Sequence, residues 1–295
     1  MNYLLHVAAV VIIYAILAEG SNFVSGHCGQ ISLCSAAFFA LGGYSTAILT
    51  RDLSLSWLTA LLVSQVAVIA LACALSQALF RAPKSQFTML SLLLNATVYY
   101  ALASPGGLAR GALGLHGIPP ARFGSFAVVT PGRQLLMVLL LYAAVQYVVR
   151  AVSRAPLARV LHAIREDEAF ASSAGKAVIA QKSRAFALMA SLSVLAGSLY
   201  VPYASYVDPS LATLGESVLI LTMMILGGAG SLRGPLVGAA VLVTLPEVLG
   251  FVGIPTASAA NIRQILYGLA LVGCMLWRPQ GLIGEYAFGR EARPK

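Results

Sequence analysis

The sequence predicts an all-α fold, a polytopic transmembrane helix bundle, and three observations support this prediction. Of the 295 residues, 59% are hydrophobic and only 10% are charged, and the mean hydropathy is +0.85. A soluble domain carries about 25% charged residues because its surface must face water. The other two observations are a series of long apolar stretches and the clustering of Lys and Arg between them. The chain is therefore built to have the lipid bilayer as its surroundings.

Nine apolar stretches approach the length of about 20 residues that a spanning helix needs. Some of them contain glycines and polar residues, so we expect about 8 to 9 membrane segments, including broken or re-entrant helices. We expect residues 1–295 to form one transmembrane domain, with a cytoplasmic segment at about 150–184 and an outer loop at about 104–133. The candidate spans are Tyr3–Ala18, Ile31–Thr50, Trp57–Phe80, Phe87–Ala103, Gln134–Val149, Ser183–Val201, Leu211–Leu226, Leu236–Gly250 and Ile262–Trp277.

The distribution of cations predicts the orientation, because cytoplasmic loops are enriched in Lys and Arg. The segment Arg150–Arg184 holds seven of the chain's 19 Lys and Arg residues, so we place it in the cytoplasm. Counting crossings from it puts Arg81, Lys84 and the basic C-terminal tail on the same side and Ser104–Arg133 outside. Nine crossings put the N-terminus outside, whereas eight crossings, with Ile31–Thr50 re-entrant, put both termini inside. The sequence leaves both open.

Glycine-rich interruptions occur in two apolar regions, one in each half of the chain. The first is Gly26–Leu33 (GHCGQISL), followed by Gly42-Gly43, and the second is Leu226–Pro235 (LGGAGSLRGP). Breaks in a helix at membrane depth free backbone groups that must face protein or a water-filled path. The pairing favours a pathway at a repeat interface; the alternative is that small residues let helices pack closely. The candidate translocation-path residues are Gly29, Gln30, Ser32, Gly42, Gly43, Gly227 and Gly228.

The basic cytoplasmic segment contains a predicted amphipathic helix. Pro156 suits a first helical position and Gly175 a helix stop. The helix would place Leu157, Val160, Leu161 and Ile164 on one apolar face. This face would lie on the bilayer surface or dock in a groove on a partner protein. Docking is favoured because the acidic cluster at 166–168 opposes anionic lipid. The candidate coupling residues are Arg159, Ala163, Ile164, Arg165, Glu166, Asp167, Glu168 and Gly175.

Several chemical signatures are absent from the sequence. It has no G-x-x-x-x-G-K-[ST] phosphate loop, since Gly175-Lys176 is followed by Ala177, and no H-E-x-x-H or G-x-S-x-G. The net charge of +9 accompanies no nucleic-acid-reading motif, and the four cysteines form no CxxC pair. Ionisable residues in the spans are few, namely His6, Glu216, Glu247 and Arg263, with no buried relay among them. We therefore expect no enzyme activity, no metal, no cofactor and no nucleic-acid partner, and an energy source outside the chain.

Several motifs match one family. They are Gly29–Leu33 (GQISL), Ala36–Phe39 (AAFF), Gly42–Tyr44 (GGY), Gly114–Pro119 (GLHGIP), Arg159–Glu168 (RVLHAIREDE), Gly227–Ser231 (GGAGS), Gly234-Pro235, Leu245–Glu247 (LPE) and Arg278–Leu282 (RPQGL). With these motifs the chain resembles, over most of its length, the permease subunits of high-affinity branched-chain amino acid ABC importers, specifically the M-type (LivM-like) subunit. Two departures bear on the substrate: Cys34-Ser35 stands where the family commonly has Gly-His, and Ala109–Gly111 where it usually has Thr-Gly-Gly.

The resemblance implies a multi-pass subunit of the bacterial inner (cytoplasmic) membrane. Its expected partners are a second permease (H-type, LivH-like), two cytoplasmic ABC ATPase subunits that use the ATP, and a periplasmic substrate-binding protein. The stretch Ala163–Glu168 resembles the segment that engages the ATPase. Branched-chain amino acids are the first expectation for the substrate, and urea, short amides and other hydrophobic or aromatic acids are alternatives. An ion-gradient-driven carrier and a membrane-embedded enzyme are the competing classes.

Overall fold

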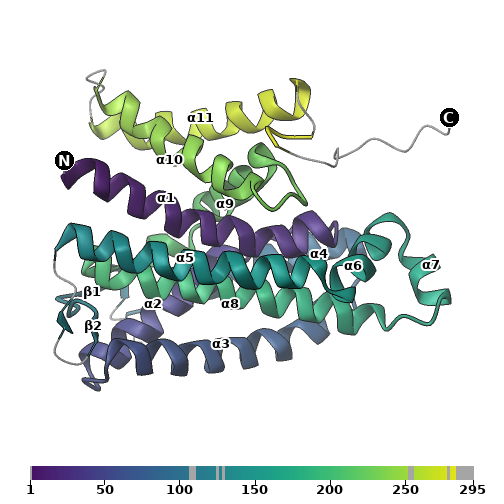
Figure 1. Ribbon diagram of the computed structural model, residues 1–295, viewed down its shortest axis with the longest axis horizontal. Helices are drawn as coiled ribbons and strands as arrows, with labels where there is room; N and C mark the ends of the chain where they lie inside the picture. The colour runs from purple at the N-terminus through teal and green to yellow at the C-terminus, as the bar shows by residue number, and fades with distance from the viewer. Residues whose placement is uncertain are drawn as a thin grey trace.

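A computed structural model of the chain describes residues 2–105, 111–123, 126–127, 130–251, 256–277 and 280–283. Its architecture is all-α apart from four two-residue strands (Figure 1), which confirms the predicted fold class. Each of the nine predicted spans corresponds to one long helix. These helices are α1 (Asn2–Ser21), α2 (Ser35–Arg51), α3 (Trp57–Leu79), α4 (Lys84–Ala103), α5 (Pro131–Arg154), α8 (Val178–Ala204), α9 (Leu214–Gly227), α10 (Gly234–Phe251) and α11 (Thr256–Trp277).

Short elements join the long helices. The segment predicted to be cytoplasmic forms α6 (Pro156–Glu166) and α7 (Glu168–Ser173), and a π-helical turn, η1 (Asn22–His27), extends α1. At the other end of the bundle lie the 3-10 turns η2 (Gly111–Leu113) and η3 (Pro209–Ala212). The strands are β1 (Leu115–His116), β2 (Arg122–Phe123), β3 (Phe126–Ala127) and β4 (Tyr206–Val207), paired antiparallel as β1 with β4 and β2 with β3.

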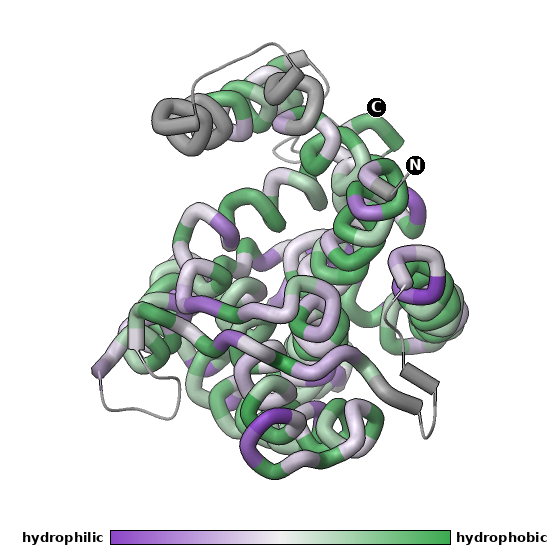
Figure 2. Tube along the Cα trace, turned by 90° about the vertical axis from the view of Figure 1, so that its left-hand side faces the viewer, coloured by the Kyte–Doolittle hydropathy of each residue, from purple (hydrophilic) through white to green (hydrophobic). Residues whose placement is uncertain are grey.

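Four helices are long and apolar enough to cross a membrane: Tyr3–His27, Trp57–Leu79, Pro131–Arg154 and Val178–Ala204. Shorter apolar helices cover Leu214–Gly227, Gly234–Pro246 and Ile265–Cys274. The four helices differ in how much of their apolar window is buried. The buried share is 72% for Val178–Ala204 and 61% for Tyr3–His27, against 28% for Trp57–Leu79 and 22% for Pro131–Arg154. α8 is therefore the central helix, and α3 and α5 present apolar residues to the surroundings. Figure 2, seen from the strand end, shows hydrophobic residues along the helices.

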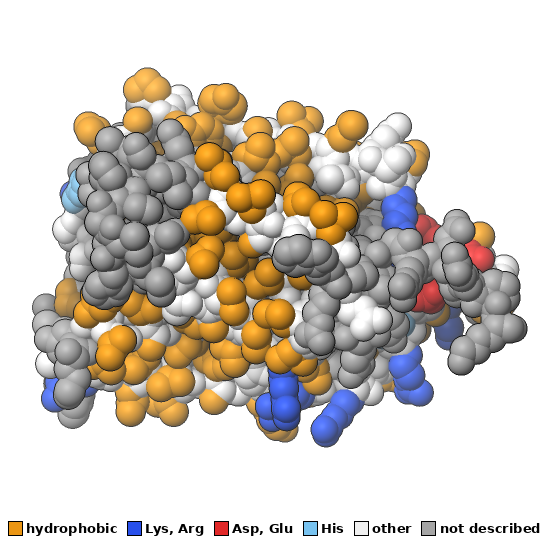
Figure 3. Space-filling model, turned by 90° about the horizontal axis from the view of Figure 1, so that it is seen from above, with side chains coloured by type: hydrophobic (Ala, Val, Ile, Leu, Met, Phe, Trp, Pro, Cys, Tyr) orange, Lys and Arg blue, Asp and Glu red, His pale blue; other side chains and the backbone are white. Residues whose placement is uncertain are grey.

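The two ends of the bundle differ in charge and structure. His6, near the start of α1, bonds Tyr203 at the end of α8, and β4 follows directly. α6 and α7 lie at the opposite end (Figure 1), and basic side chains gather over that half of the face in Figure 3. α1 begins at the strand end, and α11 runs toward the α6–α7 end (Figure 1).

Candidate functional site

The chain unwinds at the α6–α7 end of α1. All six residues of η1 are buried, Gly29 has a positive φ of 69°, and regular helix resumes only at Ser35. Side chains satisfy part of the exposed backbone: Ser25 Oγ accepts from the Ser32 N–H at 3.2 Å, and Ser91 Oγ accepts from the Leu33 N–H at 3.0 Å. Buried backbone groups need such partners wherever water is excluded. The predicted interruption at Gly26–Leu33 is therefore a break in the helix that side-chain hydrogen bonds stabilise.

The second predicted interruption lies between α9 and α10. Gly228, with a φ of 123°, ends α9. Ser231 Oγ then closes the turn by donating to the Gly228 carbonyl at 2.8 Å and accepting from the Gly234 N–H at 3.0 Å. A φ in this range is accessible to glycine at little cost, whereas a side chain would strain it. The turn at residues 228–233 is thus compact and specified by its own hydrogen bonds.

Asn22 joins the two interruptions. Its Nδ2 donates to the Ser231 carbonyl at 3.0 Å, and its Oδ1 accepts from the Gly230 N–H at 2.7 Å. Both bonds are made by a side chain that is only 3% exposed, so the contact is shielded from water. We call η1, the 228–233 turn and their contact the junction. The sequence patterns did not single out Asn22; the available signal was an amide within an apolar stretch, four residues before Gly26.

The C-terminal end of the described chain also reaches the junction. The Leu282 N–H donates to the Leu226 carbonyl at 2.8 Å, and the Ile283 N–H donates to the Gly227 carbonyl at 2.9 Å. These carbonyls belong to the last turn of α9, where no intrahelical partner is available. The Arg-Pro-Gln-Gly-Leu motif noted in the sequence thus ends in a segment that caps α9.

α6 packs directly on the junction. Arg165 Nη1 donates a hydrogen bond to the Gly26 carbonyl, and the Arg165 stem crosses Gly29, where an added Cβ would lie 2.7 Å from Arg165 Cγ. The rings of His162 and His27 also meet, with centroids 5.1 Å apart. A coupling residue predicted from sequence is therefore in contact with a predicted path residue.

The structure corrects the expectation for the apolar face of the cytoplasmic segment. Leu161 is fully buried and Ile164 is 2% exposed, and both belong to a core cluster that includes Phe186 of α8. The face is covered by the chain itself, so neither a bilayer surface nor a partner groove receives it. The helical pattern correctly predicted an apolar face, but the covering element is a tertiary feature.

The segment is also two helices rather than one. Asp167 has an extended backbone, with φ −149° and ψ 109°, and its carboxylate accepts from the Ala169 and Phe170 N–H groups at 2.8 and 3.0 Å. Asp is a favoured N-cap because it satisfies these first N–H groups. Gly175, with a φ of 74°, follows α7 and is the expected stop. The residues left exposed along α6 and α7 are Pro156, Arg159, Ala163, Glu166, Asp167, Glu168, Ala169, Phe170, Ser172 and Ser173.

A buried cation fixes α7 against α8. Lys182 Nζ lies 2.6 Å from Glu168 Oε2, and the side chains are 3% and 47% exposed. The same ammonium stands 6.0 Å from the centre of the Phe80 ring, just after α3. An unpaired ammonium at this depth would be costly, so the pair restrains Glu168.

Gly42 and Gly43 lie away from the junction, at the contact of α2 with α8. A Cβ on Gly42 would lie 2.6 Å from Val194 Cα, and one on Gly43 would lie 3.1 Å from Val201 Cγ2. From the other side, a Cβ on Gly197 would overlap the Phe39 carbonyl. This is the close helix packing that small residues permit. Gln30 and Ser32, by contrast, are buried in the unwound stretch after η1.

A buried carboxylate in α1 escaped the sequence patterns. Glu19 is 2% exposed, and its Oε1 accepts from the hydroxyl of Tyr142 at 3.1 Å and from the amide of Gln146, both on α5. The predicted first span ended at Ala18, so Glu19 lay just outside it. Glu216, which was considered, accepts from the Tyr14 hydroxyl at 3.2 Å. Among the described residues, no group of three His, Cys, Asp or Glu side chains could hold a metal ion.

These features define a polytopic membrane protein whose broken helices meet one another and a surface helix. Comparison with known proteins gives the family. Residues 3–275 match the model of the branched-chain amino acid transport system / permease component family, and the chain belongs to that family. The expected absence of an enzyme role accords with a family of transport components.

Two curated relatives agree with this assignment. The high-affinity branched-chain amino acid transport system permease protein LivM of Salmonella typhimurium strain LT2 is 28% identical over 300 residues. The LivM protein of Escherichia coli strain K12 is 27% identical over the same length. Each alignment covers 94% of this chain and 69% of the relative. No solved structure matches significantly.

Proposed function

We propose that this chain is the permease subunit of an ABC importer that moves branched-chain or related hydrophobic amino acids across the bacterial inner membrane. Family membership and the two relatives, both branched-chain amino acid transport permeases, support the substrate class. One structural observation carries the mechanism: Arg165 of the cytoplasmic segment bonds the break after α1, and Asn22 bonds that break to the second one. ATP is bound and hydrolysed by partner subunits.

The proposed coupling route has three steps. A partner ATPase moves α6 and α7, and α6 displaces η1 because the Arg165 guanidinium holds the Gly26 carbonyl. η1 in turn moves the 228–233 turn through the two bonds of Asn22. Helix ends that are joined by hydrogen bonds can shift between discrete arrangements as a unit. The path would then open beside Gly29, Gln30, Ser32, Gly227 and Gly228.

The exposed face of α6 and α7 is the proposed ATPase contact. It combines the acidic residues at 166–168 with Phe170 of α7, whose side chain is 68% exposed. An exposed aromatic ringed by charge has the composition of an interface anchor. The other proposed partners are a second permease of the H type and a periplasmic binding protein, which would select the substrate.

Gentle co-purification with mass spectrometry tests the assembly. We expect recovery of two ATPases with phosphate-loop motifs and a second hydrophobic subunit. Uptake of labelled leucine into proteoliposomes should then require ATP and the binding protein. Uptake that needs no ATPase and collapses with an ion gradient would reject the ABC assignment, and uptake of urea or short amides instead of leucine would correct the substrate.

A further inference from the structure

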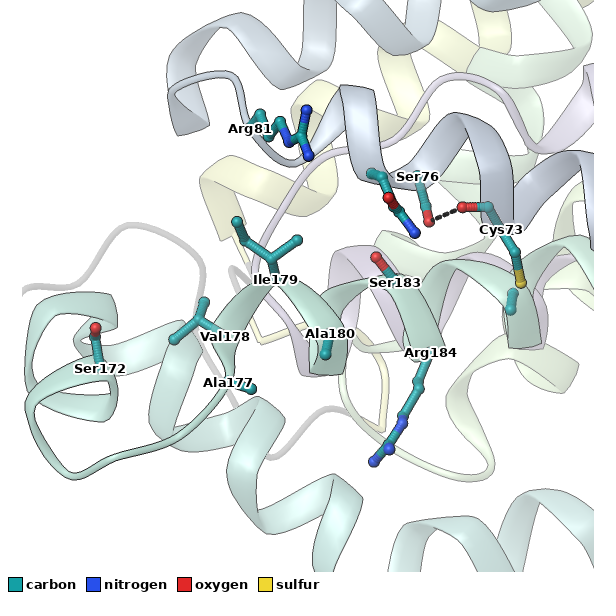
Figure 4. A pocket seen from close by; sticks show the side chains of 12 residues that line it. Cys73, Ser76, Arg81, Ser172, Ala177, Val178, Ile179, Ala180, Ser183 and Arg184 are labelled. Atoms are coloured by element: carbon teal, nitrogen blue, oxygen red, sulfur yellow. Dashed lines mark hydrogen bonds between the residues drawn. The ribbon is translucent and has the colours of Figure 1, made fainter.

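An open groove lies between the end of α3 and the start of α8, apart from the junction. Its volume is about 760 Å³, and Figure 4 shows its walls. Arg81, just past α3, points toward the space between the two helices, and Ile179, Ala180 and Ser183 of α8 lie opposite it. The groove-lining residues are Cys73, Ser76, Gln77, Arg81, Ser172, Ala177, Val178, Ile179, Ala180, Ser183, Arg184 and Ala187.

The groove has an apolar floor and a basic rim. Its described cations, Arg81 and Arg184, are both exposed. Arg184 extends along the far side of α8, where Nη1 donates to Gln181 Oε1 at 3.3 Å. No carboxylate is among the lining residues. Glu168 of α7 is paired with Lys182 of α8. The groove therefore suits a ligand with an anionic head and an apolar body.

The groove lies at the α6–α7 end of the bundle. α3 and α8 are both candidate membrane spans, and the groove occupies the end of one and the beginning of the other. Exposed apolar side chains continue the groove-lining face of α3 along the bundle, among them Val66, which is 71% exposed and lies two turns before Cys73. The placement of cations puts this end at the cytoplasmic surface, where anionic lipids attract Lys and Arg. An apolar groove that opens here faces lipid rather than water.

From these observations we propose that the groove between α3 and α8 is a binding site for an anionic phospholipid of the inner leaflet. Arg81 holds the headgroup phosphate, and an acyl chain lies along the apolar residues of α3 and α8. The acidic cluster at 166–168, which opposes lipid binding by α6, is not part of this lining.

Occupancy of the groove has a structural consequence for the cytoplasmic segment. Ser172 of α7 and Ala177, in the connection to α8, both line the groove, opposite residues of α3. A lipid seated there bridges α3 and the α7–α8 connection. The bound lipid thus restrains the base of the segment whose other end contacts the junction.

The first test measures retained lipid. The full chain, with the subunits that accompany it, is placed in nanodiscs of anionic or zwitterionic phospholipid and analysed by native mass spectrometry after detergent extraction. We expect anionic phospholipid to be retained preferentially, and Arg81→Gln to weaken retention about fivefold, since each basic residue near an anionic surface contributes about that factor. Arg184→Gln should weaken retention less. Lys84→Gln, which removes a charge at the same end but outside the lining, is the matched control.

The second test is specific to the groove. Cys73 is exposed and lines it, whereas Cys274 does not, so maleimide labelling of the two cysteines is compared peptide by peptide. Labelling of Cys73 should slow in anionic nanodiscs and recover in Arg81→Gln, while labelling of Cys274 stays constant. Equal retention of both lipid classes, or equal loss with Lys84→Gln, overturns the proposal. So does protection of Cys73 that depends on a protein subunit rather than on the lipid.

Discussion

The α2–α8 contact and the junction are both rich in glycine, but they are held together differently. Between α2 and α8, Gly42 and Gly197 remove side chains so that two regular helices approach backbone to backbone. At the junction, the helices are broken, and side chains of Asn22, Ser231 and Arg165 replace the lost helical hydrogen bonds. Packing of the first kind resists gradual deformation. A small set of directional bonds can exchange one arrangement for another, so the moving part is expected at the junction.

The largest effect should come from filling the α2–α8 contact. Gly197→Val places a side chain against the Phe39 carbonyl and the Gly43 N–H. Both are backbone groups, so they cannot move aside unless the helix itself shifts. Overpacking costs about 1–3 kcal/mol and more where the backbone must shift. We expect poor folding and a lowered thermal midpoint in detergent. Gly273→Ala in α11, where an added Cβ meets nothing within 4 Å, is the control and should fold normally.

Removing Arg165 should separate folding from transport. Arg165→Ala deletes the bond to Gly26 and the stem across Gly29, but it leaves the buried face of α6 in place. We expect uptake and substrate-stimulated ATPase activity to fall at least tenfold, as a charged hydrogen bond contributes about 1.5–3 kcal/mol. Membrane insertion should stay normal. Arg154→Ala, an exposed cation at the end of α5, controls for charge; normal coupling in Arg165→Ala would contradict the route.

Asn22→Ala should give an intermediate effect. The substitution removes both bonds to the 228–233 turn and leaves the Gly230 N–H and the Ser231 carbonyl without that partner, at a cost of about 1–3 kcal/mol. We expect a several-fold loss of uptake with ATPase activity less affected. The reason is that the contact between Asn22 and the 228–233 turn is the last step of the proposed route, farthest from the ATPase. A double-mutant cycle with Arg165→Ala checks the coupling. Strictly additive effects would mean that the two residues act separately.

The smallest effect should come from Glu168→Gln. The change leaves the buried Lys182 ammonium facing a neutral amide, but Glu168 is 47% exposed and water screens the pair, so about 1 kcal/mol is expected. Thermal unfolding measures this loss. The double variant Glu168→Gln with Lys182→Met should recover stability, since it removes the uncompensated cation. Failure to recover would indicate that Lys182 is needed for another contact.

Much of the fold was predictable because hydrophobic length is a local property. The prediction for the third span, Trp57–Phe80, differs from α3 by one residue, and the interruption singled out at Gly26–Leu33 coincides with η1 and the unwound residues 28–34. The other glycines of that region, Gly42 and Gly43, lie in regular helix instead of interrupting it. Periodicity and composition indicate that glycines occur in an apolar stretch. Whether they interrupt the helix or let it pack closely depends on what lies against them, such as the α8 backbone beside Gly42.

The candidate site was predictable in its parts but not in its contacts. The Arg159–Glu168 motif and both glycine-rich stretches were singled out, and the structure places Arg165 against Gly26 and Gly29. Their meeting depends on pairs more than 130 residues apart, which no local pattern reports. Glu19 was missed for a related reason, since its burial depends on Tyr142 and Gln146 of α5.

Because α8 is unbroken, the direction in which each of its side chains points is fixed relative to all the others. One uninterrupted helix of 27 residues carries Lys182 at one end, Gly197 in its second half and Tyr203 beside the start of α1. Successive residues of an α-helix are rotated by about 100°, so a single insertion would turn everything beyond it out of register. Substitutions on the outward surface of α8 can accumulate freely, but a change in its length would detach Gly197 from α2 or Lys182 from Glu168. Related chains can therefore diverge widely in composition here while keeping the same count of residues.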